Sequence, residues 1–171
     1  MNKPCISLCR LLSVLLISCS GCAHFSGPGR YNIRIQRETS LKNLAIEVDV
    51  IGVTEEDKNT SADVNKYWSD ALKGPRLPKT ISLQFSPGQQ DDAVLKVSGK
   101  TESEKNYRNL LNDKRILYLE IISDYPSLLE DPGAKDPRRC RVSLRKKEHR
   151  LWAKELKFLI DKDGRIDVTT P

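Results

Sequence analysis

The chain has 171 residues, of which 29 are Lys or Arg and 23 are Asp or Glu, so its formal net charge is +6. Hydrophobic residues make up 38% and charged residues 30%, which fits a single soluble globular domain and excludes a disordered chain. After the first two dozen residues no apolar run approaches the ~20 residues of a membrane-spanning helix, which excludes a multi-pass membrane protein.

The first residues have the features of an export signal. Lys3 and Arg10 form a basic start, the apolar stretch 11–17 follows, and small residues and cysteines come next. An apolar core of this length is too short to span a bilayer but is typical of a secretory signal peptide. The segment Ser20-Gly21-Cys22 resembles the cleavage box of bacterial lipoproteins, in which a Cys is lipidated and becomes the first residue.

Two cysteines have a sequence context suited to lipidation. The segment 16–19 matches the aliphatic-x-small-Cys pattern and would place the lipid, including palmitate, on Cys19. We favour Cys22, because Ser-Gly is a favourable pair before the cut and this register lengthens the apolar core. If Cys19 carries the lipid, Cys22 could pair with Cys140 in an oxidising periplasm.

These features predict three regions: a lipoprotein signal peptide at 1–21, a lipidated tether at 22–30 and a domain at 31–171. Loss of Lys3 and Arg10 with the signal lowers the charge to +6 − 2 = +4, which does not require nucleic acid. Several acyl chains would anchor the protein stably to a membrane. Because Ala23, and not Asp, follows Cys22, the resemblance to lipoproteins implies the periplasmic face of the outer membrane.

The predicted domain is mainly β. Apolar and polar residues alternate, or apolar residues run together, in eight short segments. The segments are 31–37, 44–53, 80–85, 93–97, 116–122, 140–144, 156–160 and 165–168. Helices are predicted at 63–72 and at 101–112, where Thr101 and Glu104 form a capping box. Eight strands without regular βαβ alternation predict an antiparallel two-sheet β-sandwich with one or two short helices.

The sequence offers no catalytic constellation, no metal site and no cofactor motif, so we predict a protein that is not an enzyme. Its two histidines, His24 and His149, leave little for acid–base chemistry. Cys140 occupies an inward strand position and is interpreted as a buried structural thiol.

The densest basic region lies on the predicted strand 140–144 and beside it. Alternation places Arg139, Arg141 and Arg145 on one face, which is interpreted either as a solvated face or as a docking surface. The preceding loop contains two Asp-Pro pairs whose carboxylates could bind Arg138 or Arg139. The predicted partner-binding residues are Asp131, Asp136, Arg138, Arg139, Arg141 and Arg145.

The lipidated Cys, the short tether and the sandwich resemble the small outer-membrane lipoproteins of type VI secretion, the SciN family. The resemblance is carried by segments 31–37, 44–53 with 66–69, 116–125, the loop 130–139 and the last hairpin. It implies a docking component that binds the periplasmic domain of an IcmF-like inner-membrane protein. The short link 38–43 departs from the family. The alternative is a free-standing, transthyretin-like module that binds a small ligand or a cell-wall fragment.

Overall fold

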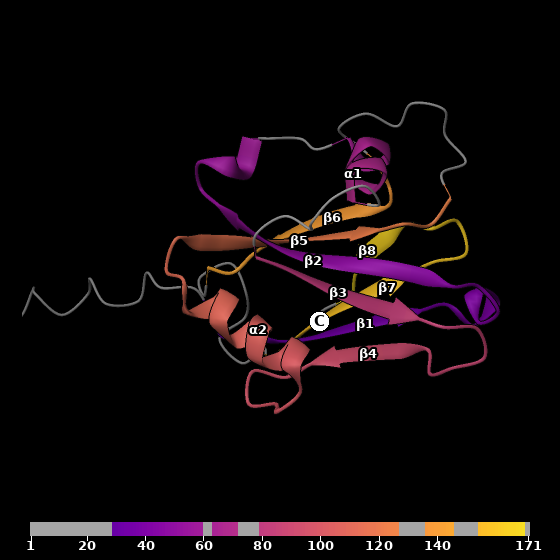
Figure 1. Ribbon diagram of the computed structural model, residues 1–171, viewed down its shortest axis with the longest axis horizontal. Helices are drawn as coiled ribbons and strands as arrows, with labels where there is room; N and C mark the ends of the chain where they lie inside the picture. The colour runs from indigo at the N-terminus through magenta and orange to yellow at the C-terminus, as the bar shows by residue number, and fades with distance from the viewer. Residues whose placement is uncertain (1–28, 60–62, 72–78, 127–135, 146–153, 170–171) are drawn as a thin grey trace, which may run out of the picture.

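The computed structural model describes residues 29–59, 63–71, 79–126, 136–145 and 154–169. Within these residues the chain forms eight strands, two α-helices and two short 3-10 helices. The strands make two four-stranded sheets that enclose a common hydrophobic core (Figure 1). The predicted β-sandwich with two helices is therefore confirmed.

The first sheet has the strand order β4-β1-β7-β8. Its strands are β1 (Asn32–Arg37), β4 (Asp92–Leu95), β7 (Glu155–Ile160) and β8 (Ile166–Val168). β1 pairs antiparallel with β4 but parallel with β7, so Ile33 lies beside Leu156. Among the described strands this parallel pair is the only departure from antiparallel pairing. It joins the beginning of the domain to its end.

The second sheet is antiparallel throughout the described strands and has the order β3-β2-β5-β6. Its strands are β2 (Ile46–Thr54), β3 (Thr80–Phe85), β5 (Ile116–Ser123) and β6 (Arg139–Ser143). β5 lies between β2 and β6, in the central position that its continuous apolar run predicts. Leu119 and Ile121 face the core, whereas Ile122 is buried on the opposite face.

Helix α2 (Glu102–Asn112) closes one end of the sandwich (Figure 1). The predicted capping box is confirmed: Thr101 Oγ1 accepts a hydrogen bond from the Glu104 backbone, and the Glu104 carboxylate accepts one from the Thr101 backbone. Leu110 and Leu111 join the core. The buried Tyr107 hydroxyl donates to the Tyr31 carbonyl at 2.8 Å, which fixes the helix against the start of β1.

Helix α1 (Val64–Ala71) covers the outer face of the second sheet. Val64, Tyr67 and Trp68 form a small apolar cluster there with residues of β2 and β5. The Trp68 indole N–H donates to the Ser123 carbonyl at 2.9 Å, at the end of β5. The two 3-10 helices are η1 (Thr39–Leu41) and η2 (Asp57–Asn59). Among the described helices, none has the length and apolar composition needed to cross a bilayer.

A buried arginine closes the end of the sandwich opposite α2. The Arg37 side chain is 0% exposed, and its Nε lies 3.0 Å from Asp91 Oδ1. Its other nitrogens donate to the carbonyl oxygens of Leu44 (2.7 Å) and Ser86 (3.0 Å), and the guanidinium lies over the Phe85 ring. Arg37 therefore links β1 of the first sheet to the chain before β2 and after β3 of the second.

We predict that Arg37→Ala lowers the free energy of unfolding by about 3 kcal/mol, because it removes a buried guanidinium that pairs with Asp91 and donates to partly buried carbonyl oxygens. The measurement is urea denaturation followed by circular dichroism. Arg34→Ala is the matched control on the same strand, since the Arg34 side chain is 33% exposed and its removal is expected to cost less than about 1 kcal/mol. Equal losses in the two variants would contradict this role of Arg37.

Candidate functional site

The predicted basic face lies on the outer side of the second sheet, but it is not a solvated face. Arg141 is the register partner of Glu120 on β5. The Arg139 Nε binds the Glu120 carboxylate, and the Arg141 guanidinium lies 3.0 Å from the same oxygen. The Arg139 and Glu120 side chains are only 9% and 7% exposed. The sequence interpretation of a solvated strand face is therefore wrong for Arg139.

The physical reason is the single carboxylate inside an otherwise apolar strand. β5 is buried on both faces, so the Glu120 carboxylate is removed from water and must be paired with cations. The neighbouring strand supplies two arginines at alternate positions, which places both beside the same carboxylate. The outer face of β5 and β6 thus carries a tightly paired cluster in which two guanidinium groups share one carboxylate, so the cluster keeps one positive charge in excess.

A second buried pair holds the chain just before β6. Arg138 Nε donates to Asp136 Oδ1 at 3.0 Å, and Arg138 Nη2 donates to Asp136 Oδ2 at 2.6 Å. The same Nη2 donates to Asn65 Oδ1 of α1 at 2.8 Å. The predicted pairing of Asp136 with Arg138 is confirmed. Because both side chains are buried, this pair holds the loop base to α1 and does not form an exposed docking patch.

Arg145 belongs to a more exposed group at the end of β6. Its guanidinium lies 2.9 Å from Glu55 Oε2 and over the Tyr118 ring. Glu55 also binds Lys58, and hydrogen bonds from Lys58 and the Tyr118 hydroxyl lower the pKa of the Glu55 carboxyl. Of the predicted partner-binding residues that the structure describes, Arg145 has the most exposed charged group, and Arg141 is partly exposed.

Cys140 packs against the main core on the inner face of β6, as predicted. Burial, reinforced by the charges of Asp167 and Glu120, raises the pKa of the Cys140 thiol to about 11. The folded protein therefore keeps the thiol protonated to higher pH than the unfolded chain does. The stability that this proton contributes is present at neutral pH and is lost as the pH rises toward 11. A protonated, partly buried thiol is a poor nucleophile.

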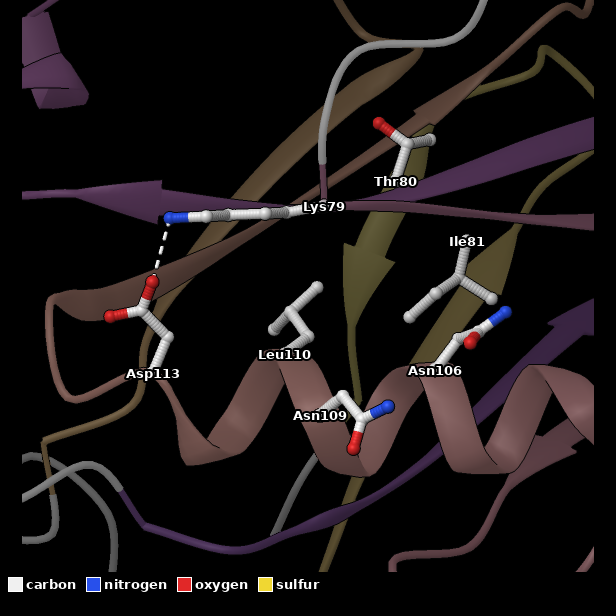
Figure 2. A pocket seen from close by; sticks show the side chains of 7 residues that line it. All are labelled: Lys79, Thr80, Ile81, Asn106, Asn109, Leu110 and Asp113. Atoms are coloured by element: carbon white, nitrogen blue, oxygen red, sulfur yellow. Dashed lines mark hydrogen bonds and ion pairs between the residues drawn. The ribbon is translucent and has the colours of Figure 1, made fainter.

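A shallow hollow of about 310 Å³ lies between the start of β3 and α2. Figure 2 shows Ile81 and Leu110 at its base, with the amides of Asn106 and Asn109 beside them and the Lys79–Asp113 ion pair at one side. The Lys79 Nζ lies 2.8 Å from Asp113 Oδ2. Hydrogen bonds from Arg115 and Lys79 hold the pKa of the Asp113 carboxyl well below its usual range. This hollow therefore offers hydrogen-bonding amides and a fixed ion pair.

Three of the predicted site residues lie outside the described residues, namely Cys19, Cys22 and Asp131. The sequence interpretation missed Glu120, Glu55 and Asn65, which bind the arginines of and beside β6. Glu120 had a signal that could have revealed it, because it is the only charged residue in the apolar run 116–122. Within the described part of the chain, no group of three His, Cys, Asp or Glu residues could hold a metal ion.

Comparisons with known proteins give structural neighbours only. No family model and no curated protein matches the sequence. Lip of Serratia marcescens, a membrane-bound component of the type VI secretion system, is 16% identical, with a TM-score of 0.49; the match covers 84% of this chain and 98% of Lip. The type VI secretion lipoprotein TssJ1 of Pseudomonas aeruginosa is 13% identical, with a TM-score of 0.49 and the same coverage of both chains.

A third neighbour is a chain of the structure of the type VI secretion protein TssM C-terminal domain from EAEC. It is 11% identical, with a TM-score of 0.48, and the match covers 81% of this chain and 98% of that one. These neighbours are components of type VI secretion systems. At such identities and scores, the likeness does not establish a function for this chain.

We predict that Arg138→Glu lowers the free energy of unfolding by about 3 kcal/mol or more, because it places two buried carboxylates side by side. Urea denaturation measures the loss, and Arg138→Gln serves if the charge-reversed protein does not fold. Arg145→Ala is the control for an exposed ion pair, with an expected change below about 1 kcal/mol. An Arg138 variant with an unchanged free energy of unfolding would show that the Arg138–Asp136 pair does not hold this region.

Proposed function

We propose that this chain is an outer-membrane lipoprotein that acts as a docking component of an envelope-spanning, type VI-like secretion complex. The observation that carries the proposal is the N-terminal sequence, in which a basic start and a short apolar core lead into Ser20-Gly21-Cys22. A residue pattern of this kind directs export and lipidation, and two or more acyl chains give stable membrane anchoring. In this proposal residues 1–21 are removed and Cys22 becomes the first residue.

The order of the strands along the chain supports the proposed role in a type VI-like secretion complex. All eight strands that the resemblance to the SciN family spans occur in the structure, from β1 to the β7–β8 hairpin. Buried ion pairs and α1 stabilise the second sheet from outside. A domain of this kind would serve as a rigid platform, because buried ion pairs hold Arg37, Arg138 and Arg139 in place. The proposed partner is the periplasmic domain of an IcmF-like inner-membrane protein.

The proposed docking surface contains fewer exposed residues than the sequence alone suggests. Asp136, Arg138 and Arg139 are buried in ion pairs, so their proposed role is to shape the surface from below. Arg141 and Arg145 are the members of the predicted set whose guanidinium groups reach solvent. Charged groups at the rim of an interface act mainly on the rate of association and on specificity.

We expect Cys22→Ser in the full chain to abolish incorporation of labelled palmitate and to release the protein from the outer-membrane fraction. The acyl chains are the proposed anchor in the outer membrane, so the protein is expected to leave that membrane when they are lost. Cys19→Ser is the matched control and is expected to change neither property. Loss of both properties in Cys19→Ser but not in Cys22→Ser would assign the lipid to Cys19. Absence of palmitate from both variants would overturn the proposed anchor.

We expect Arg145→Glu to weaken capture of an inner-membrane partner from cross-linked envelopes about fivefold, as for a rim charge worth roughly 1 kcal/mol. Arg34→Glu is the matched control, because Arg34 and Arg145 have equally exposed side chains (33%) on different sheets. Recovery of the wild-type lipoprotein without any envelope protein would overturn the docking role. That outcome would favour the free-standing module.

A further inference from the structure

The directions of the strands divide the sandwich into two ends. β1, β3, β5 and β7 begin at the end that α2 closes, and β2 and β6 finish there (Figure 1). The described chain also enters the domain here: the Gly29 N–H donates to the Leu144 carbonyl at 2.6 Å, and the Arg30 guanidinium donates to Asn112 Oδ1 at 2.8 Å. We call this the tether end, because the predicted tether 22–30 leads into it.

Five exposed cationic side chains gather at the tether end. Two lie on the turn between β4 and α2, one follows α2, one precedes β7 and one lies just before β1. They are Arg30, Lys96, Lys100, Lys114 and Lys154. Backbone contacts hold these segments together: the Asn32 N–H donates to the Lys154 carbonyl at 2.9 Å, and the Val97 N–H donates to Asn32 Oδ1 at 3.0 Å. None of the ion pairs between described residues involves these five side chains.

Most carboxylates near the tether end are already engaged. Glu104 is buried in the capping box of α2, and Asp113 lies between Lys79 and Arg115. Glu155 binds Arg34, and Glu55 binds Lys58 and Arg145. Glu102, at the start of α2, is exposed and lies 3.5 Å from Lys105, and Glu56 and Asp57 are further exposed carboxylates in this part of the described chain. The tether end therefore carries more free positive than free negative charge.

The far end of the sandwich has the opposite character. Apart from Asp91, which pairs with the buried Arg37, the connections and strand ends there carry the carboxylates Glu38, Glu47, Asp124, Asp161 and Asp163. The described cations on the same connections are Lys42, Lys162 and Arg165, because Arg37 is buried on Asp91 and Arg138 on Asp136. The domain is thus electrically polarised along its strands, with its positive end where the tether enters.

From this polarity we infer that the tether end is a membrane-facing surface that binds the headgroups of anionic phospholipids. The inference rests on the proposed lipid anchor at Cys22. Eight residues, the length of 23–30, have a random-coil end-to-end distance of about 15 Å, so the domain can approach the bilayer to within the ~8 Å over which charges act at physiological salt. The anchor therefore brings the five cations within reach of the bilayer, and the negative far end is repelled from it.

The test uses the acylated protein, added to preformed phosphatidylcholine vesicles with or without phosphatidylglycerol. A water-soluble amine-acetylating reagent then labels the lysines, and peptide mass spectrometry measures the labelling rate at each one. We expect phosphatidylglycerol to lower the rates at Lys96, Lys100, Lys114 and Lys154 about fivefold, an effect that high salt removes. Lys42, Lys66 and Lys162 are the exposed controls elsewhere on the domain, and their rates are expected to stay unchanged.

A charge-reversal variant tests whether the cations act together. In Lys96→Glu/Lys100→Glu/Lys114→Glu, we expect the remaining Lys154 to lose its protection on phosphatidylglycerol vesicles. In the control variant Lys42→Glu/Lys66→Glu/Lys162→Glu, we expect Lys154 to keep it. Equal labelling rates at the tether-end lysines on both kinds of vesicle would overturn the inference. The intact mass of the protein is measured before any vesicle is added. A mass that contains no acyl chains would instead overturn the proposed anchor.

Discussion

The β2–β5 pair at the centre of the second sheet is buried on both sides, and the surrounding structure follows from the need to cover it. Its inner side chains pack against the first sheet, while its outer side chains require a second cover. Helix α1 supplies apolar groups for part of that outer face. The arginines of β6 supply countercharges for Glu120 on the same face, and the other buried carboxylate of that face, Asp49, accepts a hydrogen bond from the Tyr67 hydroxyl of α1. The β6 arginines, whose spacing in the sequence suggests a binding surface, therefore pair with a carboxylate of β5 and stabilise that strand.

This arrangement separates the charges that hold the domain together from the charges available to other molecules. Arg37, Arg138 and Arg139 are satisfied inside the protein, and each lies where an irregular connection or a strand end must be fixed. Lys96, Lys100, Lys114 and Lys154 at the tether end form no ion pair with another described residue. Lysine is strongly hydrated and flexible, whereas arginine forms planar, directional pairs, so the division between the two residue types has a physical basis.

Strand positions were predictable because hydrophobic alternation is a local property. Each of the eight predicted segments overlaps the strand that forms there, with ends that agree to within about two residues, and the capping box marked the start of α2 correctly. The parallel pairing of β1 with β7 was not predictable, since no local pattern states which distant strand will be a neighbour. The burial of Arg139 was missed for a similar reason. Alternation identifies a shared face, but only tertiary structure determines whether water, a helix or a countercharge covers it.

The parallel β1–β7 pair has a consequence for the order of events during biogenesis. The first strand of the domain finds its central partner more than a hundred residues later, as the pairing of Ile33 with Leu156 shows. Until β7 emerges, β1 has only β4 beside it, and the first sheet cannot close over the core. Contacts between such distant segments form slowly and late. A chain that is exported from its N-terminus would thus reach the far side of the membrane still open, and the sandwich would close only after its last strands had followed.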